Sequence, residues 1–314
     1  MNYFAQLIPF IIFFAVFGLL YLTTLVLIQY NKRKKRRSPF TDIFLRSPGE
    51  SLRSRLDDIN VELNVTLVSA FIFPLIFYAG ILTQAYFAGR PFSVSSIWIF
   101  VLFAAAFEAY FIYQLVRLIN NRRNYRLGYE GEIAVGQELN ELLRDGYYVY
   151  HDFPANNFNI DHVVVGPTGV YAVETKTRRK PTTNNRRADA MVTYDGRKLQ
   201  FPDPNWVEIK PLKQARDQAQ RLQKWLSSAV GDAIQVQPVL TLPGWYVEHT
   251  SSNGFPVINP KQFRSILKSN KDNKLDESMI TRITHQLDQR CRDVHPRASE
   301  GLGGKPSLAE KVSA

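Results

Sequence analysis

Cysteine is nearly absent from this sequence: Cys291 is the only one among 314 residues. A single thiol excludes an internal disulfide framework and suits a chain that works in a reducing compartment. The sequence also shows no internal repeat.

Charged side chains are missing from long stretches of the first 120 residues. None occurs in 1–31 or 63–89, and 91–116 contain only Glu108. Each stretch is longer than the roughly 20 apolar residues that cross a bilayer, so a soluble interpretation of this part fails. We predict three transmembrane helices, at about 4–28, 65–87 and 94–119.

The distribution of basic residues predicts the orientation of these helices. The first apolar run has no positive charge before it and is too long for a typical secretory signal, so we expect it to be retained. Six consecutive basic residues, 32–37, follow this run, and three arginines follow the third run, but the loop between the second and third runs contains only Arg90. Because basic loops stay in the cytoplasm, we predict an outside N-terminus and a cytoplasmic C-terminal part, in a bacterial inner (cytoplasmic) membrane.

The net charge of +11 is concentrated beside the predicted membrane helices. Residues 1–127 contribute +8, whereas residues 128–295 contribute only +2. The excess therefore favours anionic lipid headgroups, and it is poor evidence for nucleic-acid binding.

The chain divides into a membrane domain, 1–120, a soluble α/β domain, 121–294, and a tail, 295–314, whose polar composition predicts disorder. Within the membrane domain, residues 29–64 form a polar cytoplasmic connector. Glu108 lies near the centre of the third predicted helix, where we expect a protonated or hydrogen-bonded packing role.

Patterns in the soluble part predict alternating helices and strands. A helix at 129–145 ends at Gly146, and a second helix opens at Pro211. This order is typical of a mixed-sheet α/β domain. We expect strands at 147–153, 160–165, 170–176, 191–194, 198–201, 234–242 and 257–258, and further helices at 211–228, 260–268 and 277–291.

Two acids lie in strands that otherwise look built for burial. If residues 166–169 form a four-residue hairpin loop, Asp161 faces Glu174 across the two strands, with Cβ atoms about 4.5–5.5 Å apart. Strand alternation places Lys176 on the same face as Glu174. Ionising both acids without compensation is costly, so this geometry predicts a site for a divalent cation.

Hard oxygen ligands on a rigid sheet suit Mg²⁺, or Mn²⁺ in its place. Such an ion acidifies a bound water and offsets charge that develops on phosphorus. Lys176 could orient the attacking water or neutralise the developing negative charge. On the helix at 129–145, Glu132 lies on the apolar stripe, where a carboxylate is costly unless it is paired or binds a cation.

The motifs of this region occur in a specific order. They are Gly128-x-x-Gly131-Glu132, Asn159-Ile160-Asp161-His162-Val163-Val164-Val165-Gly166-Pro167, Gly169-Val170, Glu174-x-Lys176 and Pro211-x-x-Gln214. This series, over roughly 128–245, resembles the NERD (nuclease-related domain) family, which is similar to the PD-(D/E)XK nucleases. The proline of that superfamily's name is Ile160 here, which leaves the acids intact.

The resemblance implies a restriction-endonuclease-like mixed β-sheet domain flanked by helices, after three transmembrane helices. It implies that Asp161, Glu174 and the carbonyl of Thr175 bind the metal, with Glu132 as the acid from the helix. Lys176 would be the catalytic lysine, and Gln214 a supporting residue near the phosphate. We therefore expect a membrane-anchored, metal-dependent nuclease that hydrolyses phosphodiester bonds, most simply in DNA, with the bilayer as a second partner and an undetermined oligomeric state.

Several interpretations without a catalytic role remain open at this point. The acids and Lys176 could form a structural ion pair, and Glu132 could be a first-turn acid that the helix dipole favours. A group of basic residues could hold the phosphate backbone or simply form a solvated loop; these are Arg178, Arg179, Lys180, Arg186 and Arg187. The main alternative function is a membrane-tethered module that binds nucleic acid or protein without cutting it. A transporter or sensor role for the membrane part is a further alternative.

Overall fold

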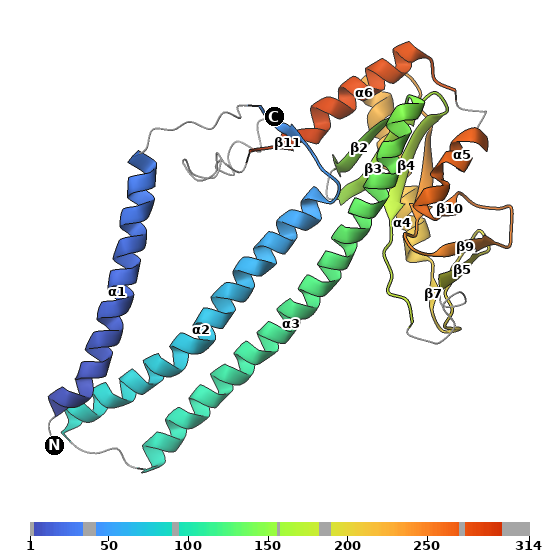
Figure 1. The fold of residues 1–314 in the computed structure, drawn as a ribbon. Helices are drawn as coiled ribbons and strands as arrows, with labels where there is room; N and C mark the ends of the chain where they lie inside the picture. Colours follow the sequence, from blue (N-terminus) through green and yellow to red (C-terminus); the bar gives the residue numbers. More distant parts are fainter. Residues whose placement is uncertain are drawn as a thin grey trace. The chain divides into compact units, whose positions relative to one another are not determined.

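The structure is a computed structural model that describes residues 3–33, 42–89, 94–155, 158–181, 190–269 and 274–296. Its contacts divide the chain into two compact units, whose elements Figure 1 shows. One unit contains Met1–Asp42, Asp58–Arg122 and His295–Ala314. The other contains Ile43–Asp57 and Arg123–Val294.

The first unit contains long apolar helices. They are α1 (Tyr3–Arg33), most of α2 (Glu50–Ala88) and the first part of α3 (Val94–Asn140). By length and composition, Glu50–Phe87 and Ile97–Asp145 could cross a membrane, whereas the apolar stretch found in α1 is shorter, Phe14–Leu27. The described residues thus support two of the three predicted spans.

Aromatic side chains join α2 to α3 within this unit. The ring of Phe73 stacks on that of Phe107, with centroids 5.3 Å apart, and Arg122 donates a hydrogen bond to Asn60 at 2.8 Å. Helix α2 continues through Pro74. The Oε1 atom of Glu108 is buried and has no hydrogen-bond partner within the described part of the chain.

A five-stranded mixed sheet forms the centre of the second unit. Its order is β10-β8-β4-β3-β2. Strand β3 pairs antiparallel with β2 and with β4, whereas β8 pairs parallel with β4 and with β10. The bounds are β2 (Tyr148–Ala155), β3 (Phe158–Gly166), β4 (Gly169–Thr175), β8 (Val236–Thr241) and β10 (Val257–Ile258).

Helices cover both faces of this sheet because the strand residues alternate between two apolar cores. Val163 and Ala172 face one core, which α4 (Lys210–Val230) and α6 (Glu277–Cys291) complete. Val164 and Val173 face the other core, which the end of α3 and α5 (Phe263–Ser269) complete. Strands buried on both faces explain the nearly continuous apolar runs in the sequence.

A four-stranded sheet of order β7-β6-β5-β9 lies beside the central one and shares a third apolar core around Trp245. The connections and short elements complete the unit. They are β1 (Phe44–Leu45), η1 (Glu141–Asp145), β5 (Met191–Tyr194), β6 (Leu199–Gln200), β7 (Val207–Glu208), β9 (Tyr246–His249), η3 (Pro260–Gln262) and β11 (Arg292–Val294).

The elements predicted from the sequence agree closely with those of the second unit. The helix that precedes β2 is the end of α3 followed by η1, and it ends at Gly146, whose φ of 81° is the left-handed value that glycine accommodates. Strands β1, β7, β9 and β11 were not predicted. Of the predicted tail, 297–314 lie outside the described residues.

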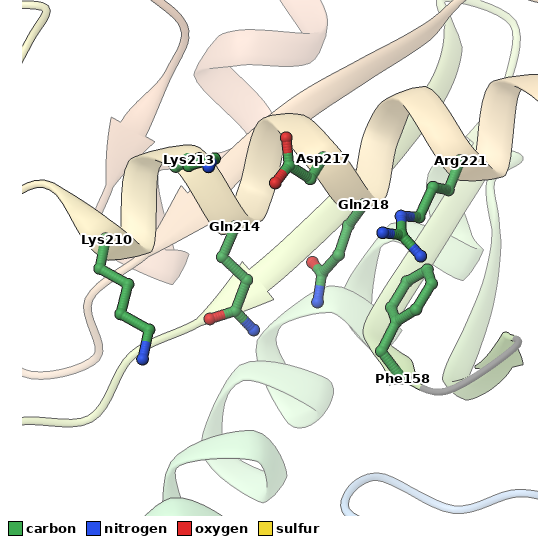
Figure 2. A pocket seen from close by; sticks show the side chains of 7 residues that line it. All are labelled: Phe158, Lys210, Lys213, Gln214, Asp217, Gln218 and Arg221. Carbon is green, nitrogen blue, oxygen red and sulfur yellow. The ribbon is translucent and has the colours of Figure 1, made fainter.

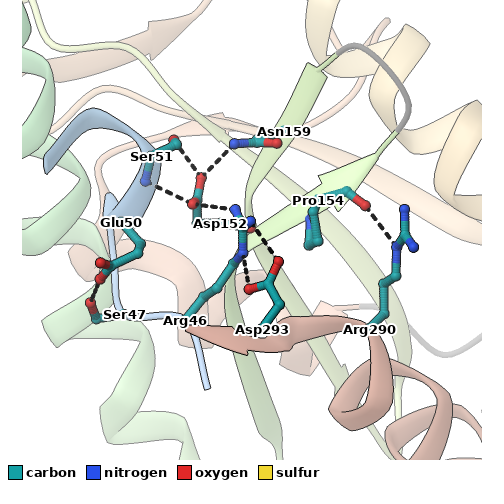
Figure 3. Close-up of polar contacts among 9 residues, drawn as sticks. All are labelled: Arg46, Ser47, Glu50, Ser51, Asp152, Pro154, Asn159, Arg290 and Asp293. Carbon is teal, nitrogen blue, oxygen red and sulfur yellow. Dashed lines mark hydrogen bonds and ion pairs between the residues drawn. The ribbon is translucent and has the colours of Figure 1, made fainter. Parts of the chain in front are cut away.

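The described residues of the predicted connector, 29–64, include the first turns of helix α2. Residues 50–64 belong to α2, and Ile43–Asp57 pack within the second unit. Figure 3 shows the main contact, in which Arg46 donates to the buried carboxylate of Asp152 at 2.8 Å and, through two nitrogens, to Asp293. Short strand β1 pairs with β11 beside it.

Candidate active site

The hairpin of β3 and β4 places Asp161 and Glu174 at the same end of the sheet. The pairs Val165–Val170 and Val163–Ala172 have the predicted register, and the ladder ends at His162–Val173, one residue before the two acids. Asp161 accepts a hydrogen bond from the backbone N–H of Thr175 at 2.7 Å. The two carboxylates therefore meet where the strand pair opens.

Neighbouring groups hold the Glu174 segment in place. The Nζ atom of Lys176 donates to Oε1 of Glu174, whose side chain is 1% exposed. On the other side, the Thr241 hydroxyl donates to the Glu174 carbonyl at 3.1 Å, and the Lys176 N–H donates to the Thr241 carbonyl at 2.9 Å. The second oxygen of Glu174, Oε2, is buried and has no partner among the described residues.

Helix α3 contributes Glu132, whose side chain is buried, with 7% exposure. Its Oε2 atom also has no partner within the described part of the chain. The helix can approach this closely because Gly131 has no side chain: a Cβ there would lie 1.7 Å from the Thr177 hydroxyl oxygen. The sequence thus places small residues where the helix meets the end of β4.

The three acids repel one another electrostatically. Burial, followed by the charges of Asp152 and Glu174, raises the pKa of Glu132 to about 8. Burial, followed by the charges of Glu174 and Glu132, raises the pKa of Asp161 well above its ordinary value, although Lys176 acts in the opposite direction. The acids therefore hold their protons more tightly than ordinary carboxyl groups, because ionising all of them beside a single lysine is unfavourable.

These acids line one pocket of about 550 Å³, together with Gln214 from the first turn of α4. All five residues predicted as catalytic reach this pocket, and so does Thr175. The pocket is also lined by Leu52, Asn124, Leu127, Gly128, Thr177, Arg178, Arg179 and Trp206.

Comparison with protein families identifies this part of the chain. Residues 127–243 match the model of the nuclease-related domain (NERD) family. Neither a curated protein nor a solved structure matches the chain significantly. The match contains every acid of the pocket, Lys176 and Gln214, and it leaves out α5 and α6.

The basic residues of the nuclease-related domain that were predicted to hold phosphate differ in their surroundings. Arg178 lines the pocket but makes a two-nitrogen ion pair with Glu208, with distances of 2.7 and 2.8 Å. Arg179 also lines it and is exposed, whereas the ammonium of Lys180 lies over the Trp245 ring, 5.9 Å from its centroid. Arg186 and Arg187 lie outside the described residues.

Sequence reasoning missed Asp152 of the nuclease-related domain. Its side chain is buried, its φ of 50° is unusual for a residue other than glycine, and its charge helps to raise the pKa of Glu132. The sequence feature that could have revealed Asp152 is the presence of an acid inside a largely apolar strand. His162 is a packed histidine: its Nδ1 lies 2.9 Å from Nδ1 of His151, and burial lowers the pKa of both rings.

The pocket of the nuclease-related domain can be tested for its fit to a cation. Among the described residues, no group of three or more histidine, cysteine, aspartate and glutamate side chains is gathered closely enough to hold a metal ion. However, Glu132 and Glu174 each have an unpartnered buried oxygen. Mg²⁺ needs only one or two carboxylates because it keeps several waters, so the donor set fits such an ion.

Proposed function

We propose that this chain is a membrane-anchored, metal-dependent nuclease that hydrolyses phosphodiester bonds in DNA. The observation that carries the proposal is the crowding of three acids and one lysine in a single pocket of the nuclease-related domain. Ionising neighbouring buried acids is unfavourable unless a cation compensates their charge. The mixed sheet between helices is compatible with a restriction-endonuclease-like fold.

In this proposal Asp161, Glu174 and the Thr175 carbonyl hold Mg²⁺ or Mn²⁺, and Glu132 assists from α3. When bound, the ion would supply charge neutralisation for the phosphate and acidify a water. Lys176 leaves its bond to Glu174 and donates to the attacking water or to a phosphate oxygen. Gln214, which also lines the pocket, donates its amide hydrogens to the phosphate.

The membrane part of the proposal has three spans in a bacterial inner membrane, with the N-terminus outside and the nuclease-related domain in the cytoplasm. Two helices of suitable length and composition support it, as do the basic residues that follow the first and third apolar runs. A reporter that works only in the cytoplasm should be active when it is fused to the C-terminus. A reporter that works only in the periplasm should be inactive at the same position.

One observation favours a second candidate, a tethered module that binds without cutting. Lys176 is bonded to Glu174, and the described acids are not gathered into a metal cluster. In that case the pair would be structural, and no divalent ion would be needed.

Incubation of the full-length protein in detergent with plasmid DNA separates the two candidates. We expect cleavage with Mg²⁺ or Mn²⁺, none in EDTA, and a loss of at least about 100-fold in Glu174→Gln and Lys176→Ala. Glu130→Gln is the matched control, because Glu130 is an exposed acid on the same helix as Glu132. Equal products from the wild type and Glu174→Gln would refute the nuclease proposal.

A further inference from the structure

A trough runs from the candidate site along helix α4. Three hollows form it, and they share residues: the site pocket and the next hollow share Gln214, and that hollow and the third share Phe158 and Arg221. Figure 2 shows the middle hollow, in which side chains of α4 project towards the start of β3. We call these three hollows the α4 trough.

Positive charge predominates in the α4 trough beyond the site. Lys210, Lys213 and Arg221 line the middle hollow with one acid, Asp217. Lys224 and Arg290 line the third hollow. Neither Lys210 nor Lys213 has an ion-pair partner among the described residues, so their ammonium groups remain available to an anion.

Aromatic rings lie between these charges. The guanidinium of Arg221 lies 4.7 Å from the centroid of the Phe158 ring, a cation–π geometry. Trp225 lines the third hollow and meets Phe153 edge to face, with centroids 5.0 Å apart. Basic side chains alternating with aromatic ones are the pattern by which proteins hold single-stranded nucleic acid, through phosphates and stacked bases.

A buried amide adds a polar contact to the middle hollow. Gln218 is 3% exposed, and its Nε2 donates to the Asn159 carbonyl at 3.0 Å. Its Oε1 atom is buried and has no partner in the described part of the chain. This oxygen could accept a hydrogen bond from a base, whereas phosphate oxygens offer no donor.

We propose that the α4 trough binds a single strand of DNA that extends from the candidate site. A duplex keeps its bases inside, so it would leave Phe158 and Trp225 without bases to stack on. Between Lys210 and Lys224 the helix rises about 21 Å, enough for several nucleotides. The inference rests on the proposed function, which places the scissile phosphate at the candidate site. It adds a preference for single-stranded over double-stranded DNA.

Fluorescence anisotropy of the full-length protein in detergent tests this inference. The probes are a labelled 20-nucleotide single strand and the matching duplex, both in EDTA so that cleavage does not interfere. We expect tighter binding of the single strand. In Lys213→Gln/Arg221→Gln we expect about 10-fold weaker binding, and a slope of log affinity against log salt that is shallower by about 1.4.

Matched variants separate this effect from damage to the fold. Lys198→Gln/Lys261→Gln removes two exposed charges outside the α4 trough and should bind like the wild type. Asp217→Asn removes the acid of the middle hollow and should tighten binding about twofold, which a misfolded protein cannot do. Equal weakening in both double variants, or tighter binding of the duplex, would overturn the inference.

The outcomes for the two proposals can be told apart. Trough variants that lose binding while no protein cleaves DNA with any divalent ion would support the α4 trough and refute the nuclease. Cleavage that needs Glu174, with single-strand binding unaffected by Lys213→Gln/Arg221→Gln, would support the nuclease and refute the trough.

Discussion

At the residue scale, Glu132 shows how a largely buried position changes the behaviour of an acid. It is buried between other acids, and its pKa is raised to about 8. An acid with a raised pKa binds a proton more tightly in the folded state than in the unfolded state. Its contribution to stability is therefore complete below pH 4.5 and is lost as the pH rises towards 8.

We predict that Glu132→Gln is more stable than the wild type at pH 8 in EDTA, because the amide removes the cost of a buried charge. The gain should be on the order of 3 kcal/mol, or roughly 5–10 °C in apparent melting temperature. The difference should shrink towards pH 5, where Glu132 is protonated. Thermal melts in detergent at both pH values measure it, and Glu130→Gln should show no such pH dependence.

The positions of the acids were predictable at this scale, but their environment was not. Opposition of Asp161 and Glu174 follows from the strand period and a short turn, which are local properties. The contribution of Asp152 to the pKa of Glu132 joins residues of different elements. Sequence spacing alone does not reveal such a neighbour.

At the element scale, the approach of α3 to the end of β4 decides whether the acids can meet. Gly131 permits this approach, since its missing Cβ would collide with Thr177. Gly128, one turn earlier, would place a Cβ 3.3 Å from the flexible end of Leu52. The two glycines therefore allow a comparison within one helix: an added Cβ would collide with Thr177 at position 131 but would meet only a flexible side chain at position 128.

We predict that Gly131→Ala destabilises the domain by about 1–3 kcal/mol, as overpacking does, and reduces metal-dependent cleavage. Gly128→Ala should be neutral or slightly stabilising, because alanine favours a helix by about 1 kcal/mol over glycine. Denaturant unfolding of the full-length protein in detergent measures both. Thr177→Ala should partly rescue Gly131→Ala, since it removes the closest atom; similar stability in the two glycine variants would contradict this account.

Elements with strong local signals were predicted correctly, and short strands were not. Helix α6 has its predicted bounds, 277–291, and Asp276 caps it with a hydrogen bond to the Met279 N–H at 2.7 Å. Strands β1 and β11 contain two and three residues, and Phe44 of β1 pairs with Val294 of β11 although α2, α3 and the central sheet lie between them in the sequence. Such pairing is determined by tertiary contacts, so no local sequence pattern predicts it.

At the scale of the whole molecule, the segment before α2 belongs to the same unit as the nuclease-related domain. Arg46 joins this segment to Asp152 of β2 and Asp293 of β11, partners 106 and 247 residues away. Ser51 adds two hydrogen bonds to Asp152, at 2.9 and 2.7 Å. A fragment that begins after residue 57 lacks all these contacts, so experiments on this unit need the full chain.

We predict that Arg46→Ala lowers the stability of this unit by about 2–3 kcal/mol. Removing one partner of a buried ion pair leaves the other charge uncompensated, which costs roughly 3–5 kcal/mol, and the Ser51 contacts to Asp152 offset part of this. Arg144→Ala is the control, because its pair with Glu141 is exposed and contributes about 0–1 kcal/mol. Limited proteolysis of the full-length protein compares the two variants, and equal resistance would contradict a structural role for the segment. Arg46→Ala/Asp152→Asn should recover part of the loss, since it removes the orphaned charge that the single variant creates.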